Sequence, residues 1–598
     1  MSGLFQSLTT RIAAVWTTLA TPSGSGLIGW IRSAVGAVLR TLQSKLSEDV
    51  PSVFDFMTAA QIADVLSGAP ALDHTDAIEN ALAAHSAPSF GTWPNKFRVS
   101  RSITLSDNQQ IRSWGARIQQ ITAQTPIFDI TGKTGCRFHG TRYIGVGTDY
   151  VDSSSSLARA ISGTNAVDTV ISWNTFSNFA YSSFYGEGVN GFTFAHNKVT
   201  GPGLSVLTPG VSRNNTGVTV GGTGIDISHN DISLTGQGLI LAQGSSNVVI
   251  NTNRMHDILV EHGMYLDTGI SNVAVTGNAL IRCYQNGIKM QWYDAYGVTP
   301  EAVVIANNSV VTTTTGDGIL VLNSTGAAAT IYATNVSITG NTVSDAGQDA
   351  ISARNLFGGN VANNLGAFAG RHGIYLEKLQ KTDVKNNVIR STQENGIYVC
   401  GAVNSLHIER NKLYLSGLAN IAANGRNSAL FTATTSEIDF VISENRIVGD
   451  NTKTKYGIYI STGTKAQFEV TENDVKDVSD FGMRLDTTDA MGRYAGNVWT
   501  GVLGAVFNEP VLPTIASASN LVMTAGQDTF FISGTTTIDS ITAPGCAGRR
   551  VTLIFLDVGT VVDGANLYLA GSFTSSANDT LSLVSDGNYW YETGRSAN

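Results

Sequence analysis

An asparagine repeat constrains the fold of this 598-residue chain more than any other feature. Between about residues 174 and 497, an Asn recurs with an apolar side chain two positions later. Successive copies are 22 to 34 residues apart, and most steps fall between 22 and 25. The asparagines of the pattern are Asn174, Asn197, Asn230, Asn253, Asn278, Asn308, Asn341, Asn363, Asn386, Asn411, Asn445, Asn473 and Asn497. A constant minimum step with occasional longer ones is typical of a structural coil that carries loop insertions.

A second marker follows each Asn by about nine or ten residues: a small residue, then a short strand of alternating apolar and variable positions. Gly263-Met-Tyr-Leu and Gly373-Ile-Tyr-Leu are examples. One such unit cannot bury its own apolar face, but stacked units can, which predicts a parallel β-helix. Right-handedness follows from the general crossover rule. We expect the asparagines at turns, where Asn tolerates left-handed backbone and can form amide ladders.

Composition supports an extended all-β chain and excludes several classes of protein. Only 14% of residues are charged, the net charge is −9, and no long basic run occurs, which argues against nucleic-acid binding. The four cysteines show no CxxC spacing, so we expect neither a zinc site nor a disulfide framework. No apolar run is long enough to span a membrane, and no secretory signal is evident. No metal or dinucleotide motif is present, so we expect no cofactor.

The first 50 residues differ from the rest of the chain. Apolar residues fall at helical spacing over residues 4–19, and a Pro-Ser-Gly-Ser-Gly break follows at 22–26. Ile28, Val35 and Leu42 are then seven apart, as in a short heptad pattern. The pattern fits either a packed pair of amphipathic helices or a trimeric coil.

The stretch 52–84, SVFDFMTAAQIADVLSGAPALDHTDAIENALAA, resembles the leading segment of phage tailspikes and related pectate-lyase-like proteins. There, a V-x-D-F strand precedes a D-x-T-x-A-I helix, and Asp73, Thr75, Ala77 and Ile78 match the second half. The paired Asp73 and Asp76 look catalytic, but capping of the helix N-terminus explains them better. The Gly-rich turn usual between the two halves is missing here.

The last 84 residues form a second all-β unit after a Pro-containing linker. The stretch CAGRRVTLIFLDVGTVVDGANLYLAGSF and the ending DGNYWYETGRSAN resemble a C-terminal module that recurs on phage tailspikes. Together the resemblances cover about nine tenths of the chain. They imply an all-β, trimeric, right-handed parallel β-helix with a short N-terminal helical segment and a C-terminal β-sandwich-like domain. The expected divisions are 1–50 for virion attachment, 51–110 for the β-helix cap, 111–510 for the glycan-binding β-helix, and 515–598 for trimerisation or carbohydrate binding.

Candidate site residues come from aligning the coils on the small residue before each strand. Alternation then predicts that the second and fourth positions after it point outward, and we expect the residue just before it to lie on the same face. Between the coils of Gly263 and Gly373 these columns concentrate carboxylates, imidazoles, cations and aromatics. In a later coil we align Asn420 with the small residue. The predicted catalytic residues are Asp267, Asp317, Asp349 and Glu261. The predicted substrate-binding residues are His262, Tyr265, Lys289, Gln291, Trp292, Tyr293, Arg354, His372, Tyr375 and Glu377.

These residue types suit a sugar-cleaving groove. Two carboxyl groups flanking a glycosidic bond can hydrolyse it, and aromatic faces stack on sugar rings. Asp317 and Asp349 occupy one position in neighbouring coils, so a close pair with one raised pKa is expected. Asp294 and Glu377 are the next carboxylates to consider. The alternative is structural: exposed ladders and a cross-coil Arg354–Glu377 ion pair also stabilise sheets.

The resemblance implies a phage tailspike that binds and depolymerises a bacterial surface polysaccharide, with hydrolysis preferred. A polysaccharide lyase, using His262, His372 or Lys289 as base, is the second interpretation. A non-enzymatic adhesin with the same surface is the third. The expected partners are the polysaccharide, two further copies of the chain, and a tail or adaptor protein bound through residues 1–50. The expected location is the virion tail, after synthesis in the host cytoplasm.

Overall fold

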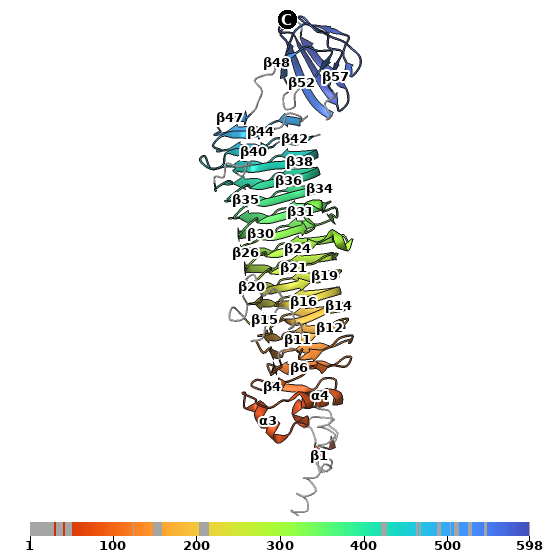
Figure 1. Ribbon diagram of the computed structural model, residues 1–598, viewed down its shortest axis with the longest axis vertical. Coiled ribbons are helices and arrows are strands. Elements are labelled where there is room, and N and C mark those ends of the chain that lie inside the picture. The colour runs from red at the N-terminus through yellow and green to blue at the C-terminus, as the bar shows by residue number, and fades with distance from the viewer. Residues whose placement is uncertain are drawn as a thin grey trace, which may run out of the picture.

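A computed structural model describes residues 29–30, 40–41, 51–122, 125–147, 158–202, 215–419, 427–461, 464–465, 468–486, 492–502, 504–507, 514–523, 529–542 and 547–596. Figure 1 shows a long column of stacked strands with two short helices at one end and a separate β domain at the other. The helices are α3 (Ala59–Leu66) and α4 (Thr75–Ala84). The parallel β-helix predicted from the asparagine repeat is confirmed.

Each coil of the column contributes to three parallel sheets. Sheet 3 has 16 strands in sequence order. They are β4 (Lys96–Val99), β7 (Arg117–Gln120), β10 (Arg142–Ile144), β13 (Thr175–Ser177), β15 (Lys198–Thr200), β17 (Asp231–Ser233), β20 (Arg254–Ile258), β23 (Ala279–Cys283), β26 (Ser309–Thr313), β30 (Thr342–Ala346), β33 (Leu365–Ala367), β35 (Val388–Arg390), β37 (Lys412–Tyr414), β39 (Arg446–Val448), β43 (Asp474–Lys476) and β46 (Val498–Thr500).

Sheets 1 and 2 are joined because several strands bend from one into the other. The shared strands are β14 (Ser182–Ala195), β16 (Thr216–Ser228), β31 (Ile351–Phe357), β34 (Ile374–Lys385), β36 (Ile397–Glu409) and β38 (Ser428–Ser443). Sheet 1 also contains β5 (Ile103–Thr104), β8 (Phe128–Asp129), β11 (Arg159–Ser162), β18 (Gln237–Leu241), β21 (Met264–Leu266), β24 (Ile288–Trp292), β27 (Ile319–Asn323), β40 (Tyr456–Ile460), β44 (Phe481–Leu485) and β47 (Gly504–Phe507). Sheet 2 also contains β3 (Ser89–Thr92), β6 (Gln110–Trp114), β9 (Arg137–His139), β12 (Val167–Ser172), β19 (Ser246–Asn251), β22 (Ser271–Thr276), β25 (Glu301–Ala306), β28 (Ala333–Thr334), β29 (Ser337–Thr339), β32 (Asn360–Ala362), β41 (Thr464–Lys465), β42 (Phe468–Thr471) and β45 (Gly492–Ala495).

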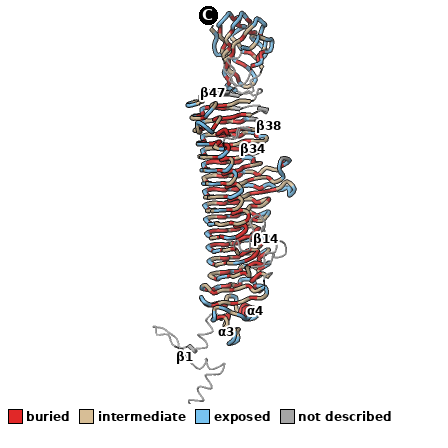
Figure 2. Tube along the Cα trace, turned by 60° about the vertical axis from the view of Figure 1, so that its left-hand side comes forward, coloured by how far each residue is buried: buried red, intermediate tan, exposed pale blue. Residues whose placement is uncertain are grey.

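A continuous apolar core fills the column from the helical cap to the last coils. The core is built from stacked columns of like residues, for example Val248, Val273 and Val303 in successive coils of sheet 2. Figure 2 shows these buried residues along the inside of the column, with exposed residues on its outer turns. Every coil thus buries its inward side chains against its neighbours, as expected for a repeat that cannot stand alone.

The turn between sheets 2 and 3 carries an asparagine ladder, as predicted. In each link, the backbone N–H and the side-chain Nδ2 of one Asn both donate to Oδ1 of the Asn in the next coil, at 2.9 to 3.2 Å. We call this set the asparagine ladder: Asn174, Asn197, Asn230, Asn253, Asn278, Asn308, Asn341, Asn364, Asn387, Asn411, Asn445, Asn473 and Asn497. Their side chains are buried or nearly so, and they satisfy backbone groups that water cannot reach.

Two details of the predicted ladder are wrong. In the doublets Asn363-Asn364 and Asn386-Asn387 the second residue, not the first, joins the ladder. The left-handed backbone also belongs to the residue before each ladder Asn, such as Asn307 with a φ of 56°. Asn363 and Asn386 themselves have φ values of 58°, so each doublet supplies both the turn residue and the ladder residue.

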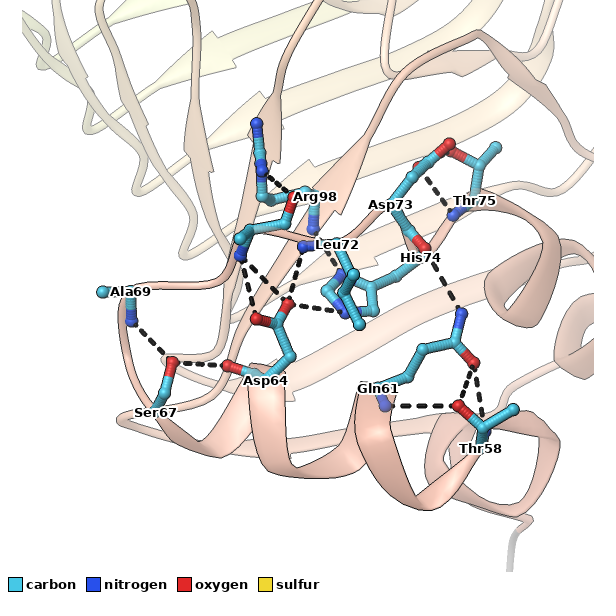
Figure 3. A network of polar contacts seen from close by, with 11 residues as sticks. Thr58, Gln61, Asp64, Ser67, Ala69, Leu72, Asp73, His74, Thr75 and Arg98 are labelled. Carbon is cyan, nitrogen blue, oxygen red and sulfur yellow. Dashed lines mark hydrogen bonds and ion pairs between the residues drawn. The ribbon is translucent and has the colours of Figure 1, made fainter.

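The first coil is covered by the helical cap, which shields a strand edge that would otherwise be unpaired. Asp64 of α3 accepts the backbone N–H groups of Ala71 and Leu72, and the buried His74 lies between Asp64 and the N–H of Arg98 (Figure 3). Asp73 accepts hydrogen bonds from the backbone and hydroxyl of Thr75, the first residue of α4. The N-cap position itself is His74, whose side chain makes no capping bond, so the predicted capping by the Asp73 and Asp76 pair is wrong in its position.

Two predictions for the N-terminal part of the chain differ from the structure. Val53–Phe56 forms the 3-10 helix η2 rather than a strand, because Ser52 and Asp55 make a capping box around it. Gly29–Trp30 (β1) and Arg40–Thr41 (β2) pair as antiparallel strands where the heptad pattern predicts helix. The remainder of the predicted helices, 4–19 included, lies outside the described residues.

The C-terminal domain has its own apolar core. Its main sheet contains β48 (Thr514–Ala516), β50 (Thr529–Ser533), β52 (Ala547–Phe555), β56 (Thr580–Asp586), β57 (Trp590–Ser596) and β54 (Leu567–Tyr568), in that order. Two short pairs complete it: β49 (Asn520–Leu521) with β51 (Ser540–Ile541), and β53 (Thr560–Val561) with β55 (Phe573–Thr574). The all-β character predicted for this unit is confirmed, and the predicted Pro-containing linker lies outside the described residues.

Candidate active site

The outward face of sheet 1 carries the predicted polar and aromatic columns in the predicted register. Tyr265 of β21 pairs with Lys289 of β24, and Tyr375 of β34 pairs with Tyr398 of β36. Arg354 of β31 pairs with Glu377. All of these side chains are partly accessible. We call the following set the outward strip: Tyr265, Asp267, Lys289, Arg354, Tyr375, Glu377 and Tyr398.

Lys289 and Tyr265 form the first half of the outward strip. The Lys289 ammonium lies 5.5 Å from the centre of the Tyr265 ring. Burial lowers the pKa of Lys289, and the negative charges of Glu261 and Asp267 oppose this shift. The Tyr265 hydroxyl donates to Asp267 Oδ1 at 3.4 Å, and burial raises the pKa of Tyr265. Two carboxylates therefore accompany a partly desolvated cation.

Tyr375 organises the second half of the outward strip. The guanidinium carbons of Arg354 and Arg371 lie 4.4 and 5.0 Å from the centre of its ring. Its hydroxyl donates to Glu377 Oε2 at 3.2 Å, and Arg354 lies 3.7 Å from the same carboxylate. Tyr398 stacks on Tyr375 with ring centres 5.3 Å apart. Stacked rings beside two arginines provide apolar faces and fixed positive charge, which suits a ring-shaped anionic ligand.

A second ladder runs beneath the outward strip, at the turn from sheet 3 into sheet 1. Four successive side chains each accept a hydrogen bond from the backbone N–H of the counterpart in the next coil, at 2.7 to 3.2 Å, and Asn395 is the last donor. We call this set the mixed ladder: Asn286, Asp317, Asp349, His372 and Asn395. His262 Nδ1 lies 3.1 Å from Asn286 Nδ2 at the start of the series.

The predicted exposure of Asp317 and Asp349 is wrong, because the mixed ladder turns both carboxyl groups toward the next coil. Asp317 is 5% exposed and Asp349 is 0% exposed. Asp349 Oδ1 accepts from Arg371 Nε at 2.8 Å, and Arg371 Nη2 binds the other oxygen. The strand alternation rule does not extend to a turn residue, whose side chain follows the local hydrogen-bonding demand instead.

The two carboxyl groups do form the close pair that was expected. Asp317 Oδ1 accepts from the backbone N–H of Asp349 at 2.9 Å. Burial raises the pKa of Asp317 to about 7, and the negative charge of Asp349 adds to this rise, while Arg354 and Arg371 oppose it. Asp317 can therefore hold a proton near neutral pH, as a general acid requires.

The predicted histidines are also buried, at 3% exposure each. Burial, and then the charge of Lys289, lower the pKa of His262 to about 3, so this ring is neutral. His372 accepts the N–H of Asn395 at Nδ1, and its Nε2 lies 3.4 Å from Glu394. The His372 ring stacks on Tyr398 with centres 4.6 Å apart. Both histidines thus support the outward strip from below.

The end of β24 and the loop after it do not present most of the predicted binding residues. Trp292 is fully buried in the core, and its Nε1 donates to Ile331 O. Gln291 is 5% exposed and bonds to Tyr293. Asp294 accepts hydrogen bonds from Asn323, Thr330 and Ile331, which fixes the loop. Tyr293 and Asp294 stay partly accessible.

Three residues of the site were not selected from the sequence: Tyr398, Arg371 and Phe431. Tyr398 pairs with Tyr375 in the next coil. Arg371 lies one position before His372, in a column whose charged residues vary from coil to coil. Its contact with Asp349, which only the structure shows, distinguishes it from the other residues of that column. Phe431 continues the column of Tyr398 because β38 begins at Ser428, so the alignment on Asn420 is wrong by several residues. Residue 420 itself lies outside the described part of the chain.

Within the described residues, no group of three or more His, Cys, Asp or Glu side chains is placed to hold a metal ion. Among those same residues, no helix is long and apolar enough to cross a membrane.

Comparisons with known proteins agree with this geometry. Residues 159–327 and 293–436 match the family model described as a right handed beta helix region. No curated protein matches the chain. Among solved structures, a mutant of the tailspike protein of E. coli bacteriophage HK620, in complex with a pentasaccharide, is 13% identical, covers 98% of both chains, and has a TM-score of 0.54. A second mutant of the same tailspike, also with a pentasaccharide, is 13% identical over 97% of this chain and 98% of that chain, with a TM-score of 0.50.

A third similar structure is gene product 12 of bacteriophage phi29 in its pre-mature form, at 11% identity, with 91% of this chain and 75% of that chain covered and a TM-score of 0.49. The chain is therefore a right-handed parallel β-helix protein. More particularly, its fold is the one seen along nearly the whole length of the HK620 tailspike.

Proposed function

We propose that this protein is a phage tailspike that binds and depolymerises a bacterial surface polysaccharide, by glycoside hydrolysis. The tailspike fold over nearly the whole chain supports the class of protein. Fold alone does not define chemistry, so the activity has to be argued from the site. The observation that carries it is the buried Asp317–Asp349 pair beneath the outward strip.

The ladder bonds by themselves do not call for carboxylates at these positions. Asn286 makes the same bond to the next coil with an amide oxygen. A buried carboxylate costs more than a buried amide, as the raised pKa of Asp317 reflects. Two ionisable groups placed where an amide suffices, under two arginines and stacked tyrosines, are better explained by chemistry than by stability.

In the proposed reaction, Asp317 protonates the glycosidic oxygen as its bond to the sugar breaks. The second carboxylate, which either attacks the sugar or activates water, comes from the partly accessible Asp267, Glu261 or Glu377, because Asp349 is fully buried and bound by Arg371. Tyr265, Tyr375 and Tyr398 stack on sugar rings. Lys289 and Arg354 pair with acidic groups of the polysaccharide. Asp267, Glu261 and Glu377 are also the next candidates for the acid, since they face the same surface.

A lyase is the second candidate, and one observation favours it. The lowered pKa of Lys289 makes its neutral form more available, and a neutral amine beside Tyr265 is a suitable base for an activated uronate proton. Hydrolysis leaves a new reducing end without unsaturation, whereas elimination leaves an unsaturated product that absorbs in the ultraviolet.

The assembly proposed with this function is a homotrimer. Residues 1–50 attach it to a tail or adaptor protein in the virion, and residues 515–598 support trimer assembly or carbohydrate binding. Synthesis takes place in the host cytoplasm. Light scattering of the full-length protein should give three times the chain mass of 63.1 kDa, and a monomer mass at micromolar concentration would contradict the trimer. Removal of residues 1–50 should abolish particle attachment but keep the action on polysaccharide.

The decisive experiment compares wild type with Asp317→Asn on capsule or lipopolysaccharide from candidate hosts. Wild type should release fragments with new reducing ends, and Asp317→Asn should release them at least about a hundredfold more slowly. Polysaccharide binding should persist in the variant. Binding without fragments in wild type would instead define an adhesin.

A further inference from the structure

Two adjoining hollows lie on the outward face of sheet 2 in the first coils, away from the outward strip. The larger has a volume of about 550 Å³ and is lined by side chains of β6, β9 and β12. The second, of about 420 Å³, shares Arg137 and Val170 with the first and continues to Asp226 of β16. No residue of these hollows takes part in the chemistry proposed above.

The strand register brings three kinds of side chain together in the larger hollow. Arg112 of β6 pairs with His139 of β9, and His139 in turn pairs with Ser172 of β12. His139 Nδ1 lies 3.2 Å from Ser172 Oγ. Arg137 lies two residues before His139 on the same face, and Trp114 lies two residues after Arg112. Two arginines, an imidazole and an indole therefore line one concave surface.

The two arginines are not used to stabilise the fold. Both Arg112 and Arg137 are exposed. Across the ranges that the structure describes, neither side chain takes part in a hydrogen bond, ion pair or ring contact. Exposed arginines elsewhere in the column do have acidic partners, such as Arg101 with Asp76 and Arg282 with Asp257. Arg137 also borders the second hollow, which Asp168 and Asp226 line, but it forms an ion pair with neither within the described residues. Two guanidinium groups without an ion-pair partner in one hollow favour an anionic ligand, which each can bind through two parallel hydrogen bonds.

Trp114 supplies the apolar part of the same surface. It is 81% exposed although it lines the hollow, and it is the most exposed large apolar residue in the described chain. An indole in this setting gains by covering its ring, and a sugar ring offers a flat face of C–H groups for that contact. The neighbouring hydroxyl of Ser172 and imidazole of His139 can bond to sugar hydroxyls.

We propose that this hollow is an accessory binding site for an oligosaccharide that carries carboxylate groups. Trp114 stacks on one sugar ring, and Arg112 and Arg137 bind carboxylates of the chain. The site adds affinity for an acidic polysaccharide without cleaving it. It does not depend on the activity proposed for the outward strip, because a binding site here serves an adhesin equally well.

The test measures binding of acidic and neutral oligosaccharides to the full-length protein by calorimetry and tryptophan fluorescence. The probes are oligogalacturonate, hyaluronan oligosaccharide and sialyllactose, with maltooligosaccharide as the neutral control. At least one acidic probe should bind saturably and the neutral control should not. Arg112→Gln with Arg137→Gln should weaken that binding about tenfold or more, as loss of charged hydrogen bonds predicts. Trp114→Ala should weaken it and remove the fluorescence change.

Arg446→Gln, at an exposed arginine on β39 of sheet 3, is the matched control and should bind as wild type. Absence of binding by all three acidic probes, or unchanged binding in the double variant, would overturn the proposal. A changed oligomeric state in the double variant would also overturn it, since the hollow would then be a contact between copies of the chain. The double variant should keep the fragment release of wild type. A protein that binds acidic probes here but releases no fragments contradicts only the proposed hydrolysis.

Discussion

The two ladders of the column do the same structural work with different chemistry. In both, a buried side chain accepts the backbone N–H of a neighbouring coil. The donor belongs to the preceding coil in the asparagine ladder and to the next coil in the mixed ladder. The asparagine ladder is uniform and uncharged, and each Nδ2 also donates to a backbone carbonyl, as Asn308 does to Val275. The mixed ladder has amides, carboxyls and an imidazole in the same role. Only the second ladder lies beneath the outward strip.

The asparagine ladder indicates that the stability of such a turn requires only an amide. The amide oxygen accepts a backbone N–H and the amide nitrogen donates to a backbone carbonyl. Thirteen asparagines repeat this arrangement along the column. At the positions where the mixed ladder has a residue other than Asn, a titratable side chain lies beside arginines and tyrosines. Two exchanges therefore test whether the titratable groups of the mixed ladder serve function. One replaces a carboxyl of the mixed ladder by an amide, and the other replaces an amide of the asparagine ladder by a carboxyl.

The largest expected effect is on activity in Asp317→Asn. The amide keeps an oxygen for the N–H of Asp349, so the thermal midpoint should change little. The rate of fragment release should fall by about two to four orders of magnitude, because the proton donor is gone. The rate of fragment release from purified polysaccharide tests the loss of activity, and a thermal melt tests the unchanged stability. Asp474→Asn, at an exposed position on β43 of sheet 3, is the matched control. If Asp317→Asn releases fragments at the wild-type rate, the general acid is Asp267, Glu261 or Glu377 instead.

The reverse exchange, Asn308→Asp, should be strongly destabilising. The carboxylate loses the bonds that Nδ2 donates to Val275 O and to Asn341 Oδ1, and it faces those oxygens instead. An uncompensated buried charge costs about 3–5 kcal/mol at neutral pH. Denaturant unfolding at pH 7 measures the loss. Asn307→Asp is the control, because Asn307 is exposed and in a left-handed conformation that Asp tolerates. Equal stability of the two variants would contradict the structural role of the ladder.

A smaller loss is expected in Arg371→Met, which leaves the buried Asp349 without its charged partner. The expected cost is about 2–3 kcal/mol, since the N–H of His372 still binds one carboxyl oxygen. In Arg354→Met the partner Glu377 is partly solvated, so the expected cost is below about 1 kcal/mol. Chemical denaturation of both variants measures this difference. A larger loss for Arg354→Met would show that the outward strip, rather than the mixed ladder, depends on arginine for stability.

The smallest effect concerns the pH dependence of stability. The pKa of Asp317 is raised in the folded state, so its contribution to stability is present below about pH 4 and is lost as pH rises through about 7. Wild type should therefore lose about 1 kcal/mol or more between about pH 5 and 8 relative to Asp317→Asn. Unfolding at fixed scan rate across this range measures it, because large β-helices can unfold irreversibly. Parallel pH profiles for the two proteins would argue that Asp317 is ionised throughout.

The sequence predicted the coil, the inward core and the outward columns because these follow from a period and from strand alternation. Tyr265, Lys289, Tyr375 and Glu377 were placed correctly for this reason. The site predictions failed at turns and loops. Trp292 was expected at the surface but packs in the core, since its indole N–H finds a partner in Ile331. The insertion before β38 also broke the alignment, so Phe431 was missed.

What the sequence determined by itself is the architecture: a step of 22 to 25 residues, with Asn at one turn and Gly before one strand, admits only stacked coils. What only the tertiary structure decided is the burial and the bonding of the residues at the turn from sheet 3 into sheet 1. Whether Asp317 and Asp349 face water or the next coil depends on which backbone N–H groups lie within reach, and those belong to residues about 30 positions away. Local pattern carries no information on that distance, so burial, charge pairing and the resulting pKa shift appear only in the folded column.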